Sequence, residues 1–400
     1  MKREDDAPMQ TLIIVGTGLA GYNLAREWRK RAPQDRLIMI SRDAGHSYSK
    51  PLLSTAFAKG KGAEDLVMAR REAMAGQLAA EILTAELRHI DTAARQIELA
   101  DGQRLAYDHL VLALGADPFR PPLAGSGAAS VLSVNDLEDY ARLRAALQGR
   151  RKVLILGGGL IGCEFANDLL QGGFSVDLVE PAGRLLPALL PAAAASALAQ
   201  ALTDAGVRLH LHAEGWAVAV HHLDQGLRVE FRDGSHLDTE VVVSAIGLRP
   251  RIALAQAAGL SCARGIRVDR YLRTSAAHVY ALGDCAEVEG LLLPYVLPLM
   301  AQARALAQTL SATPTQVHYP AMPVQVKTSV CPVVVAPVAA DSVGEWSVAG
   351  QGQDLRLLFH DSSGQLRGFV LLGQAAGQAA DKATLQKQLP DLLPVESEHE

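Results

Sequence analysis

Two glycine-rich segments carry the clearest chemical signal in this 400-residue sequence. Each has the spacing G-x-G-x-x-G and directly follows a short aliphatic run, residues 12–15 in one case and 153–156 in the other. In such a loop the first glycine makes a tight turn, the second lets a pyrophosphate approach the backbone, and the third lets helix and strand pack closely. Each segment therefore predicts a dinucleotide site. The loop residues assigned to binding are Gly16, Gly18, Leu19, Ala20 and Gly21 in the first segment, and Gly157, Gly159, Leu160, Ile161 and Gly162 in the second.

The elements around both loops follow the order that a dinucleotide fold requires. In the first unit we expect a strand over 12–15, a helix over 19–30 and a strand over 37–40. In the second unit a strand over 153–156 precedes the loop, and a helix and a strand over 175–179 follow it. A parallel sheet with crossover helices results, so the fold class is α/β with two Rossmann-like domains.

Polar residues at the ends of the second strands should contact ribose. Glu180 lies 18 residues beyond Gly162, where a carboxylate can accept hydrogen bonds from both ribose hydroxyls and would repel a 2′-phosphate. This favours NADH over NADPH, although Arg184 is close enough in sequence to reach a phosphate. In the first unit the strand ends in Ser41 and the nearest carboxylate is Asp43, so either residue could hold that ribose.

Composition excludes several other classes of protein. The chain has 49% hydrophobic and 20% charged residues, and its net charge of −5 gives no general field for nucleic acid. The N-terminus does not have the pattern of a signal peptide, and the uncharged stretch 185–202 is broken by Pro187 and Pro191, so we expect a buried or amphipathic helix there and no membrane insertion. The four cysteines are far apart, and His210, His212, His221 and His222 lack ligand partners at suitable spacing; we therefore expect reduced thiols, no metal site and a cytoplasmic location.

Four further segments resemble the glutathione-reductase-like flavoprotein superfamily, and within it the rubredoxin and ferredoxin reductases. They are residues 48–54 (YSKPLLS), 110–116 (LVLALGA), 241–250 (VVVSAIGLRP) and 274–285 (TSAAHVYALGDC). Leu114 departs from the pattern, because the family usually has Thr there. The resemblance covers nearly the whole chain and implies FAD in the first unit and NADH in the second. It also implies a discontinuous FAD domain interrupted by the NADH domain, followed by a small C-terminal α+β domain.

The resemblance also assigns roles to individual residues. Asp284 should accept hydrogen bonds from the ribityl chain of FAD, and a helix over 299–310 should direct its N-terminus at the flavin. Lys50 and Glu164 should form a salt bridge beside flavin N5, where hydride arrives, and we assign them as the catalytic pair. The remaining residues assigned to FAD are Pro51, Ala113, Gly115, Pro298 and Lys327, and Gly247 is assigned to NADH.

The domain boundaries follow from these segments. Residues 117–130 are rich in proline and glycine, which is typical of a crossing between domains. We therefore expect FAD-binding segments at 1–116 and 249–318, the NADH-binding domain at 117–248 and the C-terminal domain at 319–400. In that last region, residues 355–360 and 366–372 should form a hairpin around the turn 361–364.

The missing cysteines indicate that the electrons leave the flavin without a sulfur relay. Related disulfide reductases carry a Cys-x4-Cys pair in the first helix, and peroxidase-like relatives carry a cysteine near Tyr48; this chain has neither. Electrons should therefore pass directly from the flavin to an external one-electron acceptor. The resemblance implies that this acceptor is rubredoxin, which takes the electrons singly, for example to supply an alkane hydroxylase. The alternatives are a ferredoxin reductase of an oxygenase system and an NADH-sensing flavoprotein that regulates a partner, and the oligomeric state, monomer or dimer, stays open. An acidic carrier would suit a basic docking patch, for which the candidates are Arg42, Lys50, Lys59, Lys61, Arg70, Arg71 and Lys327.

Overall fold

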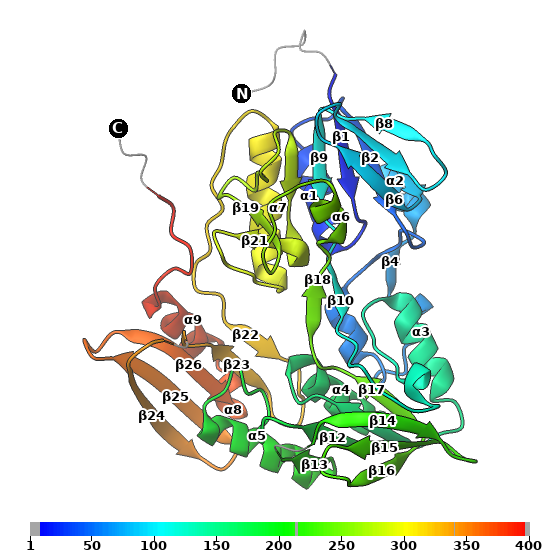
Figure 1. The fold of residues 1–400 in the computed structure, drawn as a ribbon. Coiled ribbons are helices and arrows are strands. Elements are labelled where there is room, and N and C mark those ends of the chain that lie inside the picture. The colour runs from blue at the N-terminus through cyan, green and yellow to red at the C-terminus, as the bar shows by residue number, and fades with distance from the viewer. Residues whose placement is uncertain (1–8, 213–214, 340, 397–400) are drawn as a thin grey trace.

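A parallel sheet built from two distant stretches of the chain forms the first layer of the protein (Figure 1). The computed structural model describes residues 9–212, 215–339 and 341–396. The strand order is β20-β9-β1-β2-β5, and all neighbours are parallel. The strands are β1 (Thr11–Val15), β2 (Arg36–Ser41), β5 (Ala80–Thr84), β9 (His109–Leu112) and β20 (Val279–Ala281). Because β20 follows the second unit in the sequence, the domain that contains this sheet is discontinuous, as predicted.

Buried aliphatic residues explain why these strands occupy the centre of the layer. Leu12, Ile13 and Ile14 are fully buried, as expected for a parallel strand covered on both faces. Helices α1 (Leu19–Arg29) and α7 (Val296–Leu310) pack against each other beside the sheet. The other elements of this half are β3 (Ser47–Tyr48), β4 (Val67–Ala69), α2 (Arg71–Leu78), the antiparallel β6 (Leu87–Asp91), β7 (Gln96–Leu99) and β8 (Arg104–Ala106), α6 (Ala253–Ala257), β19 (Ile266–Val268) and β21 (Ala286–Val288).

The second parallel sheet has the order β13-β12-β11-β17. Its strands are β11 (Lys152–Leu156), β12 (Ser175–Glu180), β13 (Arg208–Leu211) and β17 (Val241–Ser244), accompanied by α3 (Leu137–Ala146), α4 (Leu160–Gln171), α5 (Ala192–Ala205) and the antiparallel β14 (Ala217–His222), β15 (Leu227–Phe231) and β16 (His236–Thr239). The strands predicted at 153–156 and 175–179 are confirmed. The helix expected within 185–202 begins only at Ala192, because Pro191 is its N-cap and the residues before it form bends and a turn.

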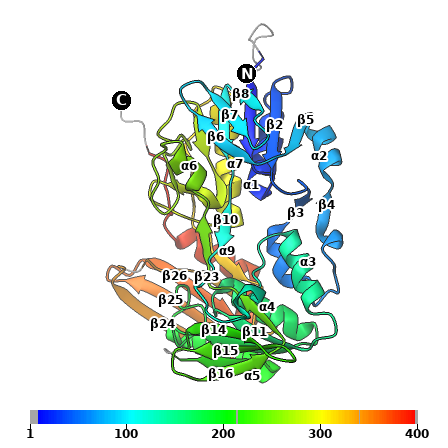
Figure 2. The same cartoon turned by 45° about the vertical axis from the view of Figure 1, so that its right-hand side comes forward.

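Two short antiparallel strands connect the halves of the molecule (Figures 1 and 2). Strand β10 (Ala116–Pro118) leads into the second unit, and β18 (Leu248–Pro250) pairs with it on the way back. Arg251, which follows β18, stabilises this crossing. It pairs with Asp117 at 2.6 Å and donates to Leu114 O at 2.9 Å. We propose domain boundaries at 116 and 248 because the chain crosses between the sheets at these strands.

The C-terminal region is an antiparallel sheet flanked by helices. Its order is β22-β23-β26-β25-β24, from β22 (Val324–Val326), β23 (Val333–Ala336), β24 (Gly344–Gln351), β25 (Asp354–Asp361) and β26 (Leu366–Leu372), with α8 (Gln374–Gly377) and α9 (Ala379–Gln388) following. The predicted hairpin is confirmed as β25 and β26. Phe369 and Leu371 of β26 pack with Leu385 of α9 in a separate small core.

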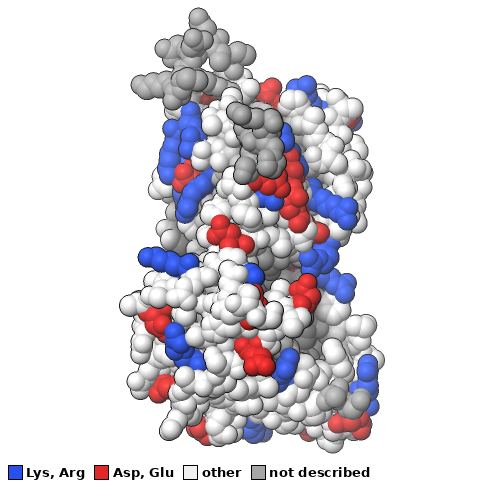
Figure 3. All heavy atoms as spheres, turned by 90° about the vertical axis from the view of Figure 1, so that its left-hand side faces the viewer, with Lys and Arg blue, Asp and Glu red and all other residues white. Residues whose placement is uncertain are grey.

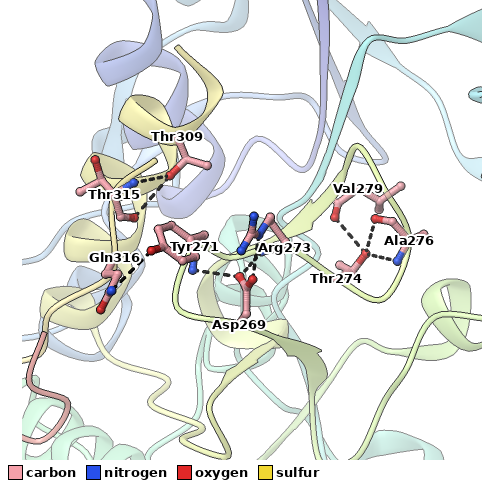
Figure 4. Close-up of polar contacts among 9 residues, drawn as sticks. All are labelled: Asp269, Tyr271, Arg273, Thr274, Ala276, Val279, Thr309, Thr315 and Gln316. Atoms are coloured by element: carbon pink, nitrogen blue, oxygen red, sulfur yellow. Dashed lines mark hydrogen bonds and ion pairs between the residues drawn. The ribbon is translucent and has the colours of Figure 1, made fainter. Parts of the chain in front are cut away.

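Local polar contacts stabilise the loop before β20 and the segment that follows α7 (Figure 4). Asp269 accepts the backbone N–H of Tyr271 at 2.9 Å and pairs with Arg273 at 2.7 Å, and the hydroxyl of Thr274 donates to Val279 O at 2.9 Å. Gln316, beyond α7, donates to the Tyr271 hydroxyl at 3.4 Å. These bonds fix the loop that leads into β20 and join it to the segment that follows α7.

Candidate active site

The first glycine loop has the tight geometry that its sequence predicts. Gly16 has a φ of +121°, and a Cβ on it would lie 2.2 Å from Ala113 O; a Cβ on Gly21 would lie 2.0 Å from Gly16 O. In contrast, a Cβ on Gly18 would meet no atom within 4 Å. Gly18 is also the N-cap of α1 and provides no side-chain cap, so the first N–H groups of that helix stay available.

The second loop repeats this arrangement. Gly157 has a φ of +104°, a Cβ on Gly162 would lie 1.9 Å from Gly157 O, and Gly159, the uncapped N-cap of α4, again faces open space. In both loops the outer glycines allow close packing, while the middle glycine leaves the backbone open to a ligand. The residues therefore fit the pyrophosphate groups of two dinucleotides.

A single cavity of about 2220 Å³ joins the two loops. Sites for one small ligand usually measure about 300–1,000 Å³, so this cavity has room for two dinucleotides. It is lined by every residue that the sequence assigned to FAD, NADH or catalysis except Gly21 and Gly162, which lie behind the loops and pack against Gly16 and Gly157.

The two ribose positions differ in their polar groups. The Thr17 hydroxyl donates to Ser41 Oγ at 2.7 Å, and Ser41 Oγ donates to Asp43 Oδ1 at 2.6 Å, where the Gly45 N–H also binds. All three side chains line the cavity, so Ser41 and Asp43 act as one hydrogen-bonded unit. The sequence left open whether Ser41 or Asp43 holds the ribose. In the structure the two side chains are hydrogen-bonded to each other and belong to one network.

Glu180 has a structural role that the sequence did not indicate. Its carboxylate accepts the N–H of Gly158 at 2.7 Å and the N–H of Ala182 at 2.8 Å, and so braces the glycine loop. The side chain also lines the cavity, as a ribose ligand must. Arg184 does not line the cavity, and its guanidinium donates to Pro187 O at 3.3 Å.

The predicted salt bridge between Lys50 and Glu164 is wrong. Glu164 pairs instead with Lys327, whose Nζ lies 2.8 Å from Oε2, and Lys50 Nζ lies 3.9 Å from Asp284 Oδ2. The reason is that the segment after β22 brings Lys327 onto the face of α4 that carries Glu164. Burial lowers the pKa of Lys50, and the nearby Asp284 opposes that shift.

Glu164 and Lys327 form a junction between three segments that are remote in sequence. The Glu164 side chain is only 1% exposed, and its carboxylate also accepts the Ser54 hydroxyl at 2.5 Å and the backbone N–H of Lys327 at 3.0 Å. Lys327 Nζ in turn donates to Pro51 O and to Ser54 Oγ. Ser54 belongs to the short helix 50–55, Glu164 to α4 and Lys327 to the C-terminal domain, so one buried ion pair joins all three regions at the cavity wall.

The turn that carries Asp284 is held by a buried glutamine that sequence reasoning missed. Gln302 Oε1 accepts the Gly283 N–H at 2.6 Å, and Gln302 Nε2 donates to the Tyr319 hydroxyl at 2.7 Å. Gln302 is 2% exposed on α7, within an otherwise apolar face. A glutamine among alanines and leucines was the available signal, since a buried amide must find partners.

Helix α7 begins earlier than predicted. It starts at Val296 instead of Leu299, so Pro298 occupies its first turn, where a missing N–H breaks no helical bond. Residues 296–299 line the cavity. The positive end of the helix dipole therefore lies at the cavity wall, where it can stabilise negative charge.

All four cysteines are free, and burial raises the pKa of the Cys163 thiol and brings that of Cys285 to about 11. Within 9–212, 215–339 and 341–396, no cluster of three or more His, Cys, Asp or Glu could hold a metal ion. In the same ranges, no helix has the length and apolar character needed to span a bilayer.

The residues of the predicted basic docking patch lie in different environments. Arg70 pairs with Glu64 and Arg71 with Glu72, both at 3.1 Å, while Lys327 belongs to the junction above. Arg42 and Lys50 line the cavity. Figure 3 shows basic and acidic side chains interspersed on the face that includes the C-terminal sheet. The patch as a whole stays a prediction.

Comparison with known proteins agrees with this geometry. The family model described as pyridine nucleotide-disulphide oxidoreductase matches residues 10–312. The chain belongs to this family. A second model, described as rubredoxin binding C-terminal domain, matches residues 316–389.

Individual relatives are similar over nearly the whole chain. The rubredoxin-NAD(+) reductase of Alcanivorax borkumensis is 52% identical over 388 residues, covering 96% of this chain and 100% of the relative. The rubredoxin-NAD(+) reductase of Acinetobacter baylyi is 42% identical over 394 residues, covering 97% and 100%. Among solved structures, the ferredoxin reductase for the CYP199A2 system of Rhodopseudomonas palustris superposes with a TM-score of 0.85 at 26% identity, covering 95% of each chain.

Proposed function

We propose that this protein is an NADH-dependent flavoprotein reductase that passes electrons one at a time to rubredoxin. The observation that carries the proposal is one cavity lined by both glycine loops, next to a C-terminal region that matches the rubredoxin-binding domain. The relatives named as rubredoxin-NAD(+) reductases support the same activity. When bound, FAD accepts two electrons as hydride from NADH and can release them singly to a one-electron carrier.

The residues of the chain bind and orient the two dinucleotides. The backbone N–H groups at Gly18 and Gly159, at the starts of α1 and α4, bind the pyrophosphates. Glu180 accepts the ribose hydroxyls of NADH while its backbone bonds keep the glycine loop in place. Because an acidic group at this position repels a 2′-phosphate, the donor is NADH and not NADPH.

Positive potential at the cavity wall serves the electron transfer. The N-terminus of α7 and Lys50 both line the cavity, where they would stabilise negative charge on a bound, reduced cofactor. Asp284 keeps Lys50 in position at 3.9 Å. Glu164 acts through Lys327 and Ser54, so we assign it as a positioning residue that keeps three segments together.

A comparison of electron carriers tests the proposal. Steady-state reduction of cytochrome c by NADH is measured with purified rubredoxin, with a [2Fe–2S] ferredoxin, and without a carrier. Rubredoxin should give the largest stimulation. A larger effect of ferredoxin would favour a ferredoxin reductase, the activity named for the Rhodopseudomonas palustris protein. If neither carrier raises the rate, electron transfer is not the function, and a regulatory flavoprotein becomes the better interpretation.

The proposal also covers the location of the protein in the cell and the enzyme that uses the electrons. Free, largely buried cysteines are consistent with a reducing, cytoplasmic location. We propose an alkane hydroxylase as one consumer of the electrons carried by rubredoxin. Deletion of the gene should then slow growth on an alkane and leave growth on a sugar unchanged.

A further inference from the structure

Trp216 is an aromatic side chain that the assigned functions leave unexplained. It is 50% exposed, whereas Trp28 is 1% exposed, and it lines the cavity on the side of the second glycine loop. Large aromatic rings contribute most when they are covered, so a half-open tryptophan on a cavity wall offers a surface to a ligand.

The backbone around Trp216 holds it beside the end of β12. A Cβ on Gly215 would lie 3.1 Å from Val179 Cγ1, so the residue before Trp216 packs closely on the residue before Glu180. The Gly215 N–H donates to His212 O at 3.0 Å, and the Arg232 N–H donates to Trp216 O at 2.9 Å. These contacts hold the backbone at Trp216 close to the end of β12, where Glu180 lies.

We propose that Trp216 stacks on the adenine ring of NADH. This role rests on the proposed use of NADH as donor. Adenine is bonded to the ribose that Glu180 receives, so it must lie close to Glu180 and away from the pyrophosphate at Gly159. Trp216 is an aromatic side chain that lines the cavity at that point, and flat aromatic surfaces stack on nucleobases.

Tryptophan fluorescence of the FAD-loaded protein provides a direct readout. ADP-ribose, which contains the adenosine half of the donor, should quench part of the emission, because a stacked adenine lies against Trp216. Nicotinamide mononucleotide, which lacks adenine, should not quench it. Neither compound absorbs at the wavelengths of tryptophan emission, in contrast to NADH.

Substitutions assign the signal among the three tryptophans. Trp216→Phe should abolish the quenching and keep most of the affinity, because phenylalanine still stacks. Trp216→Ala should weaken binding of ADP-ribose roughly tenfold by calorimetry. Trp346, which packs edge-on against Phe359 in the C-terminal sheet, provides the matched control: Trp346→Phe should leave the quenching and the affinity unchanged.

The possible failures are distinguishable. If ADP-ribose does not bind the wild-type protein at all, the proposed use of NADH fails together with the role of Trp216. If ADP-ribose binds but Trp216→Phe retains the quenching, or Trp216→Ala binds ADP-ribose as tightly as the wild type, the stacking assignment alone is overturned.

Discussion

The buried pair of Glu164 and Lys327 gives the most specific prediction. The Glu164 side chain is 1% exposed and that of Lys327 is 31% exposed, with 2.8 Å between the charged atoms. Removing one partner of a buried pair leaves an uncompensated charge and costs about 3–5 kcal/mol. We expect about 3 kcal/mol for Lys327→Met, at the lower end because Glu164 keeps its bonds from Ser54 and from the Lys327 N–H.

A double-mutant cycle isolates the pair. Glu164→Gln should cost about 2 kcal/mol, since Lys327 Nζ keeps Pro51 O and Ser54 Oγ as acceptors. The double variant should lose only about 3 kcal/mol in total, because no buried charge remains, and the coupling energy would then be about 2 kcal/mol.

Urea unfolding followed by circular dichroism at a fixed excess of FAD measures these free energies. Hydrogen exchange should also rise in β22 of the single variants, because the pair joins this strand to α4. The exposed pair of Arg70 and Glu64 provides the control, and Arg70→Met should change neither quantity measurably. Strictly additive losses from Glu164 and Lys327, or unchanged exchange in β22, would refute the role of the junction.

Four further predictions concern the cavity, the donor, acid stability and docking. Lys50→Met should slow flavin reduction by NADH in stopped-flow measurements, and an unchanged rate would show that the cation is not needed. Glu180→Ala should reduce the preference for NADH over NADPH in kcat/KM; full retention of the preference would mean that the ribose contact lies elsewhere. Burial raises the pKa of Asp177, but hydrogen bonds from His210 and Arg208 outweigh this and lower it from 3.8 to about 2. The ion pair thus adds stability above about pH 4 that is lost as the pH falls toward 2, and Asp177→Asn should flatten this part of the pH dependence of unfolding. Added salt should lower the rate of electron transfer to rubredoxin, whereas a rate independent of salt would argue against a basic docking patch.

Local patterns made much of the fold predictable. A buried strand, a glycine loop and a helix are adjacent in sequence, and their roles follow from steric rules that act over a few residues, as Gly16 and Gly21 illustrate. The hairpin of β25 and β26 was predictable for the same reason. The start of α7 was placed three residues late because Pro298 was taken as a boundary, although the first turn of a helix accepts proline.

Contacts between distant segments were the part that sequence could not supply. Glu164 was assigned to Lys50 because both belong to family motifs, but its actual partner depends on where β22 packs. The bonds from Gln302 to Gly283 and Tyr319 likewise join a helix, a turn and the C-terminal segment. Such partners are selected by tertiary packing, and no periodicity of the chain encodes them.

An anaerobic titration tests the central claim most directly. Oxidised rubredoxin is mixed with a catalytic amount of the FAD-loaded protein, and NADH is added while the visible absorbance of the rubredoxin iron centre is recorded. Since hydride carries two electrons and the iron centre accepts one, each NADH should bleach two rubredoxins, and omission of the protein should stop the reaction. Rubredoxin that stays oxidised while NADH and the loaded protein are both present would contradict the proposed function.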